Sequence, residues 1–192
     1  MAQLQMIFNA ETTPIPAAEL PEGFRFRTIS DAELPVYNEL RVAAGFTAWK
    51  ESDLALFRER VLDDAIYLAE ERATGRFAAS AAASSSLMAV HLRHGSLDWV
   101  MTHPDFRGKH LGRIVSIRAM QRLHEHGYRT FYLLTDDARL PAIKTYLGLG
   151  WRPWLFQEDM EPRWRKIADD LGRDLSSLNC LPADSCFPDK VS

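Results

Sequence analysis

The stretch of the chain with the clearest chemical potential is THPDFRGKHLG, residues 102–112. It combines two glycines with an arginine, a lysine and histidines, and it lies between an apolar, strand-like run and a long amphipathic run. Glycines at a strand-to-helix junction let backbone N–H groups approach an anion closely, and the positive end of a helix favours negative charge. The stretch therefore predicts a phosphate-binding turn.

The charge pattern makes this anion site local rather than general. The chain has 192 residues, with 23 lysines and arginines against 26 acidic residues and a net charge of -3. This balance argues against nucleic acid and against an anionic membrane surface as partners. Between residues 103 and 129, however, six basic residues face only two acidic ones.

The remaining bulk features predict a cytoplasmic enzyme without a metal. No apolar run approaches the roughly 20 residues of a membrane span, and the N-terminus lacks the basic start of a signal peptide. Cys180 and Cys186 lie in the terminal segment without further zinc ligands around them. We therefore expect two free thiols there and no metal site.

The flanking segments predict the elements that hold the turn. Strands are expected at 24–30, 95–103, 128–135 and 151–156, with two more around a turn at Thr74-Gly75. Apolar residues at helical spacing, with end signals, predict helices within 30–46, 51–64, 109–127, 140–150 and 161–175. Strand, glycine turn, helix and strand make a βαβ unit, and its right-handed crossover places two neighbouring strands parallel.

The chain divides into three parts on these patterns. Residues 1–22 carry three prolines and no periodicity, so we expect an irregular N-terminal arm. Residues 23–160 form one domain, and residues 161–192 form a C-terminal helix and a loosely ordered tail.

Two motifs together give the chain a family resemblance. Arg107-Gly108-Lys109-His110-Leu111-Gly112 follows a strand and opens a helix, and the later helix ends in Tyr146, Gly150 and Trp151. From about residue 23 to residue 157 the chain resembles the GNAT superfamily of acyl-CoA-dependent N-acetyltransferases. That family carries Arg/Gln-x-x-Gly-x-Gly/Ala in its pyrophosphate loop and Tyr-x-x-x-Gly-Phe at the later helix end.

The resemblance implies a mixed α/β (α+β) fold. Its sheet is mostly antiparallel, a central parallel strand pair splays around the cofactor, and helices cover both faces. The strand at residues 100–102 would splay from the strand at residues 128–134, and its free backbone groups would bind the pantetheine arm. The acetyl-CoA-binding residues that we predict are Val100, Met101, Thr102, Arg107, Gly108, Lys109, His110, Leu111, Gly112, Arg113 and Arg139.

Three positions depart from the family pattern. His110 stands where the family usually has its middle glycine, and we expect it to adopt helical backbone angles in the first turn. Arg139 stands where many relatives have an asparagine that contacts the cofactor. Trp151 replaces the more common phenylalanine.

Acetyl transfer to an amine requires that the amine lose a proton. An alkylamine with a pKa near 10.4 is neutral in only roughly one molecule in 2,500 at pH 7. Asp98 shares a strand face with Ser96 and Val100 by the period of two, so we predict it as the base, acting directly or through water. A merely solvated or capping aspartate is the alternative, and Asp136 and Asp137 are rival candidates.

The departing thiolate of coenzyme A later needs a proton. Tyr146 matches the family position of the acid that supplies it, whereas a bare helical tyrosine would more often serve packing. The predicted catalytic residues are therefore Tyr146 and Asp98.

The sequence leads to one main function and one alternative. Because no cysteine lies near the motifs to carry an acetyl group, we expect direct attack by a primary amine in a ternary complex. The alternative is a non-catalytic acyl-CoA-binding or sensing module. The expected partners are acetyl-CoA and an amine acceptor, and the chain is a monomer or a homodimer.

Overall fold

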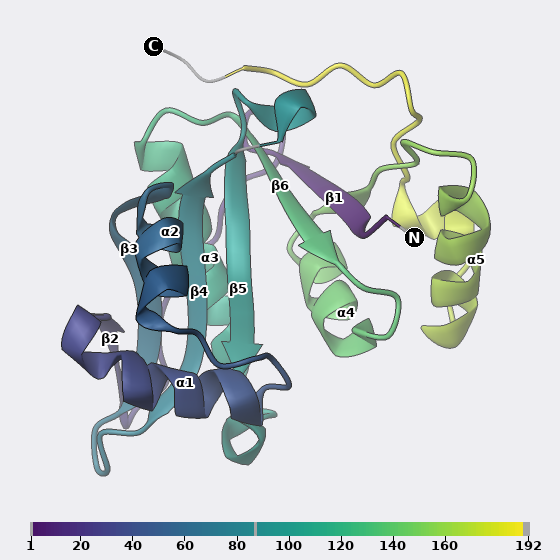
Figure 1. Ribbon diagram of the computed structural model, residues 1–192. Coiled ribbons are helices and arrows are strands. Elements are labelled where there is room, and N and C mark those ends of the chain that lie inside the picture. Colours follow the sequence, from purple (N-terminus) through teal and green to yellow (C-terminus); the bar gives the residue numbers. More distant parts are fainter. Residues whose placement is uncertain (1, 87, 190–192) are drawn as a thin grey trace.

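A single seven-stranded sheet forms the centre of the computed structural model, which describes residues 2–86 and 88–189 (Figure 1). The strand order is β2-β3-β4-β5-β6-β1-β7. The strands are β1 (Leu4–Asn9), β2 (Phe24–Thr28), β3 (Val61–Glu71), β4 (Phe77–Ser85), β5 (Gly95–Thr102), β6 (Thr130–Thr135) and β7 (Arg152–Pro153). Among these, β5 and β6 pair in parallel and the other neighbours pair antiparallel. The predicted fold class is thus confirmed.

The parallel pair separates soon after it forms. β5 and β6 are matched at Gly95 with Phe131 and at Ser96 with Tyr132, and at no later described position. Figure 1 shows the two strands diverging toward the C-terminal end of β5. The predicted splay between residues 100–102 and β6 is therefore present, and it leaves one edge of β5 without a neighbouring strand.

Helices cover both faces of the sheet. Helices α1 (Leu34–Ala43) and α2 (Glu51–Arg58) pack on one face, where Tyr37, Leu40 and Phe57 form a core with Met101. Helix α3 (Leu111–Glu125) packs on the other face and buries Val115, Ala119 and Leu123 there. The remaining helices are α4 (Leu140–Gly148) and α5 (Met160–Asp170), with short 3-10 helices at Asp31–Glu33, Ala89–His91, Pro104–Phe106 and Leu175–Leu178.

The sequence predicted an irregular N-terminal arm, but part of this arm forms a strand. Residues Leu4–Asn9 form β1, which inserts between β6 and β7. The apolar side chains of Leu4, Met6 and Phe8 are fully buried. Burial of such side chains contributes about 1.5 to 3 kcal/mol each, enough to order a short segment despite the three prolines that follow it.

The C-terminal segment also makes more contacts than a loosely ordered tail would. Leu181 bridges to Trp154, and the Phe187 ring lies 5.3 Å from the Trp154 ring. The hydroxyl of Thr130 on β6 donates a 2.7 Å hydrogen bond to the carbonyl of Pro188.

Cys180 and Cys186 are free thiols, as expected. None of the helices in the described part of the chain is both long enough and apolar enough to cross a membrane.

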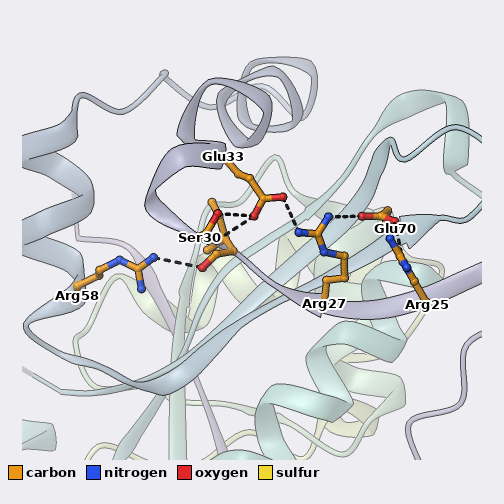
Figure 2. A network of polar contacts seen from close by, with 7 residues as sticks. Arg25, Arg27, Ser30, Glu33, Arg58 and Glu70 are labelled. Carbon is orange, nitrogen blue, oxygen red and sulfur yellow. Dashed lines mark hydrogen bonds and ion pairs between the residues drawn. The ribbon is translucent and has the colours of Figure 1, made fainter.

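An ion-pair network fastens the segment before α1 to the edge of the sheet (Figure 2). Glu70 on β3 is 2% exposed and pairs with both Arg25 and Arg27 of β2. Burial alone would raise the pKa of Glu70, but hydrogen bonds from the two guanidinium groups outweigh burial and lower that pKa. Arg27 also pairs with Glu33, which caps the backbone at Ser30. The network thus fixes α1 relative to β2 and β3.

Candidate active site

A cavity of about 500 Å³ opens beside β5 where that strand has left β6. Its walls come from the end of β5, the turn before α3, the first turn of α3 and the helix α4. Ten of the eleven predicted cofactor-binding residues line it: Val100, Met101, Thr102, Arg107, Gly108, His110, Leu111, Gly112, Arg113 and Arg139. Lys109 does not line the cavity, because its ammonium group lies over the Phe24 ring, 5.9 Å from the centroid.

Free backbone donors gather at the head of α3. The N–H groups of residues 108–113 donate to no acceptor among the described residues, whereas the N–H of Ile114 donates to the carbonyl of His110 at 3.1 Å. Gly108 has a positive φ of 79°, which its lack of a Cβ permits. A row of unpaired N–H groups at the positive end of a 15-residue helix is a site suited to an oxyanion.

His110 does not adopt the helical angles that the sequence predicted. It is the N-cap of α3 with φ 58° and ψ 14°, which is the left-handed region. Histidine is several-fold enriched among the few non-glycine residues found there, but the conformation still costs roughly 1 to 3 kcal/mol. The turn is therefore strained at His110, where a glycine would adopt the same angles without that cost.

Gly112 gives α3 its close approach to β5. A Cβ on Gly112 would lie 2.6 Å from the Thr102 hydroxyl oxygen, which is closer than real contacts allow. A side chain at position 112 would thus force the Thr102 hydroxyl to shift, so glycine fits best between the strand end and the first helical turn.

Arg139 braces the open edge of β5. Its guanidinium group donates a 2.9 Å hydrogen bond to the carbonyl of Val100 and lies 4.7 Å from the centroid of the Phe46 ring. As the N-cap of α4, Arg139 connects this helix to the strand end across the splay. The sequence predicted that Arg139 binds cofactor, but not that it holds this carbonyl.

Tyr146 lies in the cavity wall, as its predicted role requires. It is 3% exposed, and its ring packs 6.3 Å from the Trp151 ring. Burial raises the pKa of Tyr146 to about 12, and the nearby charge of Arg139 only partly offsets that rise. The hydroxyl is therefore protonated throughout the physiological range.

The sequence predicted that Asp98 shares a strand face with Val100, and this prediction is wrong. Trp99 has φ 50° and the pairing between β4 and β5 shifts there, so a β-bulge turns Val100 to the opposite face. The Asp98 carboxylate pairs with Arg60 at 2.7 Å and accepts hydrogen bonds from Ser84 and Ser96. It does not line the cavity.

The rival carboxylates are also engaged elsewhere. Asp137 pairs with Arg163 of α5 at 2.5 Å, and this hydrogen-bonded partner lowers the pKa of Asp137. Asp136 accepts a hydrogen bond of 3.2 Å from Gln3. Neither side chain lines the cavity. Among the described residues no cluster of histidine, cysteine, aspartate or glutamate side chains could hold a metal ion.

Several lining residues were not predicted as site residues from the sequence. They are Ala44, Phe106, Pro141, Ala142 and Thr145. The residues from α4 could have been found from the sequence, since positions 141, 142, 145 and 146 fall on one helix face at spacings of three and four. Ala44 could not, because it belongs to the far end of α1, remote in sequence from the motifs.

The comparisons with known proteins agree with this geometry. The sequence model of the Acetyltransferase (GNAT) family matches residues 34–151, more than half of the chain. The chain belongs to the GNAT acetyltransferase family. The matched range holds both signatures and every predicted site residue, and the chain has the α/β fold of this family.

Individual relatives are more distant from this GNAT chain. A mycothiol acetyltransferase from Thermobispora bispora is 29% identical over 158 residues, covering 74% of this chain and 51% of the relative. A GCN5-related N-acetyltransferase from Sphaerobacter thermophilus has a TM-score of 0.62 at 18% identity, covering 80% of this chain and 49% of that one. The structure of yncA from Salmonella typhimurium with its cofactor acetyl-CoA has a TM-score of 0.52 at 17% identity, with coverage of 67% and 79%. The chain thus spans about half the length of the first two relatives.

Proposed function

We propose that this GNAT chain transfers the acetyl group of acetyl-CoA to a primary amine by direct attack in a ternary complex. The observation that carries the proposal is the row of unpaired N–H groups of residues 108–113, which lies beside a cavity that also contains Tyr146. One protein of similar fold has been solved with acetyl-CoA, and another is named an N-acetyltransferase.

Acetyl-CoA would be held at two places in the cavity. The diphosphate would accept hydrogen bonds from backbone N–H groups between Gly108 and Arg113, with Arg107 adding charge. Charge-assisted hydrogen bonds of this kind contribute about 1.5 to 3 kcal/mol each. The amides of the pantetheine arm would pair with the free edge of β5 in the manner of an added strand. The acetyl group would then lie between β5 and α4.

The amine would react as its free base. No carboxylate lines the cavity, and Asp98 is bound by Arg60, Ser84 and Ser96. We therefore do not assign Asp98 the role of base, and propose that solvent removes the amine proton before attack. An alkylamine has a pKa near 10.4. At pH values below that pKa, its free-base fraction increases about tenfold for each unit by which the pH is raised.

Tyr146 would assist departure of the sulfur. Its hydroxyl, with a pKa raised to about 12 by burial, stays protonated and can donate to the sulfur as the thioester bond breaks. A thiol has a pKa near 8.5, well below this value, so a hydrogen bond supplies more of the stabilisation than complete proton transfer. No residue forms a covalent acetyl intermediate in this scheme.

The test is release of coenzyme A thiol from acetyl-CoA in the presence of a panel of amines. The proposal predicts release above the hydrolysis background for at least one class of amine, and absence of release from every class would contradict it. Calorimetry with acetyl-CoA distinguishes the two remaining cases. Tight binding without transfer would identify a non-catalytic acyl-CoA-binding module, and no binding would exclude both functions. A cytoplasmic location and a monomeric or homodimeric state stay predictions.

A further inference from the structure

A buried arginine on α1 lies behind the cavity wall, since it contacts Phe46, which in turn contacts the lining residue Arg139. Arg41 on α1 is 2% exposed, and it forms no ion pair with any described residue. Its Nε donates to the carbonyl of Thr47 at 3.0 Å, but its Nη1 is buried without any hydrogen-bond partner in the described chain. Buried guanidinium groups are normally paired, so an uncompensated one requires an explanation.

Aromatic rings surround this guanidinium group. Its central carbon lies 3.9 Å from the Trp49 ring centroid, 4.4 Å from that of Trp99 and 5.8 Å from that of Phe46. Ring faces stabilise the cation but cannot accept all of its N–H groups. The Trp99 indole N–H is likewise buried without a partner in the described residues. The Tyr37 hydroxyl interacts with the Arg41 side chain, yet Arg41 Nη1 and Trp99 Nε1 remain two buried donors that no described oxygen accepts from.

The cluster does not itself line the cavity, but it is linked to the cavity wall through Phe46 and Arg139. Phe46 contacts both Arg41 and Arg139, and the latter lies 4.7 Å from its ring and lines the cavity. Trp99 directly precedes Val100, and Ala44 at the end of α1 also lines the cavity. Two guanidinium groups that form no ion pair with a described carboxylate thus flank one phenyl ring. The Asp53 carboxylate acts on Arg41 electrostatically, but it accepts its 2.7 Å hydrogen bond from the backbone N–H of Lys50. The local charge at this end is positive.

We propose that the amine acceptor carries a carboxylate and that Arg41 binds it. This inference rests on the proposed function, since it names the acceptor class for the same site. A carboxylate can accept from a guanidinium group at two oxygens, and it would satisfy the orphan Nη1 and neutralise the buried charge. Substrates of this kind include free amino acids and other amines with a carboxylate.

The segment from Gly45 to Lys50 must move for the acceptor to enter. Phe46, Thr47 and Trp49 cover the Arg41 guanidinium group. Asn38 fastens this segment by accepting from the Trp49 N–H at 2.8 Å and donating to the Trp49 carbonyl at 2.7 Å. Gly45, with φ 89°, is the hinge from which the segment leaves α1.

The first experiment does not depend on catalysis. The protein saturated with coenzyme A is titrated calorimetrically with the N-acetyl forms of alanine, methionine and phenylalanine, and with the amides of the same three compounds. At least one carboxylate is expected to bind tenfold or more tightly than its amide. Equal binding of carboxylate and amide in all three pairs would overturn the inference, even if the protein acetylates amines.

The second experiment uses variants. Arg41→Gln should lower the ratio of carboxylate to amide affinity to near one with little change for the amide, and Arg41→Lys should keep part of the preference. Arg165→Gln, at an exposed position on α5, is the matched control and should leave the ratio unchanged. Loss of both affinities together in Arg41→Gln would indicate a structural role and contradict the proposal. Failure of every amine to release thiol, with the carboxylate preference intact, would instead contradict the proposed function alone.

Discussion

The Arg139 guanidinium group donates a 2.9 Å hydrogen bond to the carbonyl of Val100, and so joins the start of α4 to the unpaired edge of β5. Without this bond the Val100 carbonyl would lose its connection to the start of α4. The contact fixes the wall of the cavity in which both the cofactor and the acetyl group are proposed to lie.

Replacing Arg139 should therefore weaken acetyl-CoA binding. Arg139→Ala removes one charge-assisted hydrogen bond, so we expect the Kd for acetyl-CoA to rise about tenfold, equivalent to roughly 1.4 kcal/mol. Calorimetric titration measures this change. Arg129→Ala serves as the control, because Arg129 lies outside the cavity and contacts His124. An unchanged Kd in Arg139→Ala would show that the Val100 contact does not shape the site.

Tyr146→Phe should lower turnover while leaving the Kd for acetyl-CoA nearly unchanged. The substitution keeps the packed ring and removes only the donor for the departing sulfur, and general acid assistance typically contributes about 10² to 10⁴-fold. Steady-state kinetics with direct binding measurements separate the two effects. Because the pKa of Tyr146 is raised to about 12, the wild-type rate should have no descending limb from this group below pH 10. Normal turnover in Tyr146→Phe would remove the acid role.

The strained turn gives a prediction about stability. His110→Gly should raise the free energy of unfolding by about 1 kcal/mol, since glycine adopts the left-handed angles without the steric cost. Gly108→Ala, at φ 79° in a place where the added methyl group would meet no neighbour within 4 Å, should lower that free energy by a similar amount through backbone strain alone. Denaturant unfolding measures both. If His110→Gly also weakens acetyl-CoA binding, the imidazole itself contacts the cofactor.

Gly112→Ala should destabilise the junction between β5 and α3 by about 1 to 3 kcal/mol. The added methyl group would lie 2.6 Å from the Thr102 hydroxyl oxygen. Thr102→Ala removes that oxygen, so the double variant should recover much of the lost stability and acetyl-CoA affinity. Additive losses in the double-mutant cycle would mean that the close approach does not explain the glycine.

A buried histidine pair predicts a pH dependence of stability. His91 is fully buried, its ring nitrogens lie 3.0 Å from His94 and 2.8 Å from Gln5, and burial lowers the pKa of His91 to about 4. With an unfolded value near 6.5, its contribution is complete above pH 6.5 and is lost as the pH falls from 6.5 toward 4. The loss should amount to about 3 kcal/mol. The difference between the unfolding free energies at pH 7 and pH 4.5 should be smaller in His91→Gln than in the wild type, with the remainder coming from groups such as His94, whose pKa burial also lowers. His124→Gln on the surface should behave like the wild type.

The sequence predicted the elements around the site better than it predicted local backbone detail. The glycine turn, the amphipathic run of α3 and the later helix are local patterns, and each was found where the residues placed it. β1 was missed because its partner β6 lies far along the chain, and a six-residue apolar run does not specify pairing at that distance. Only the tertiary fold makes those residues a strand.

The prediction of the site was wrong at two non-glycine residues with positive φ. Trp99 carries the bulge that reverses the faces of Asp98 and Val100, and His110 holds a left-handed turn. Tryptophan does not signal such angles in a sequence, and a period of two does not reveal that a bulge interrupts it. At His110 the signal was present, because histidine is enriched in the left-handed region and the family has a glycine at that position. The sequence did not predict the role of Arg41 for a different reason. A single arginine on an amphipathic helix does not reveal that it lies among aromatic rings without an acidic partner.

A crystal structure of the protein with acetyl-CoA tests the central claim most directly. We predict the diphosphate within hydrogen-bond distance of backbone N–H groups between Gly108 and Arg113, and the thioester between β5 and Tyr146. A complex in which the cofactor lies elsewhere, or in which the His110 side chain fills the diphosphate position, would contradict this claim.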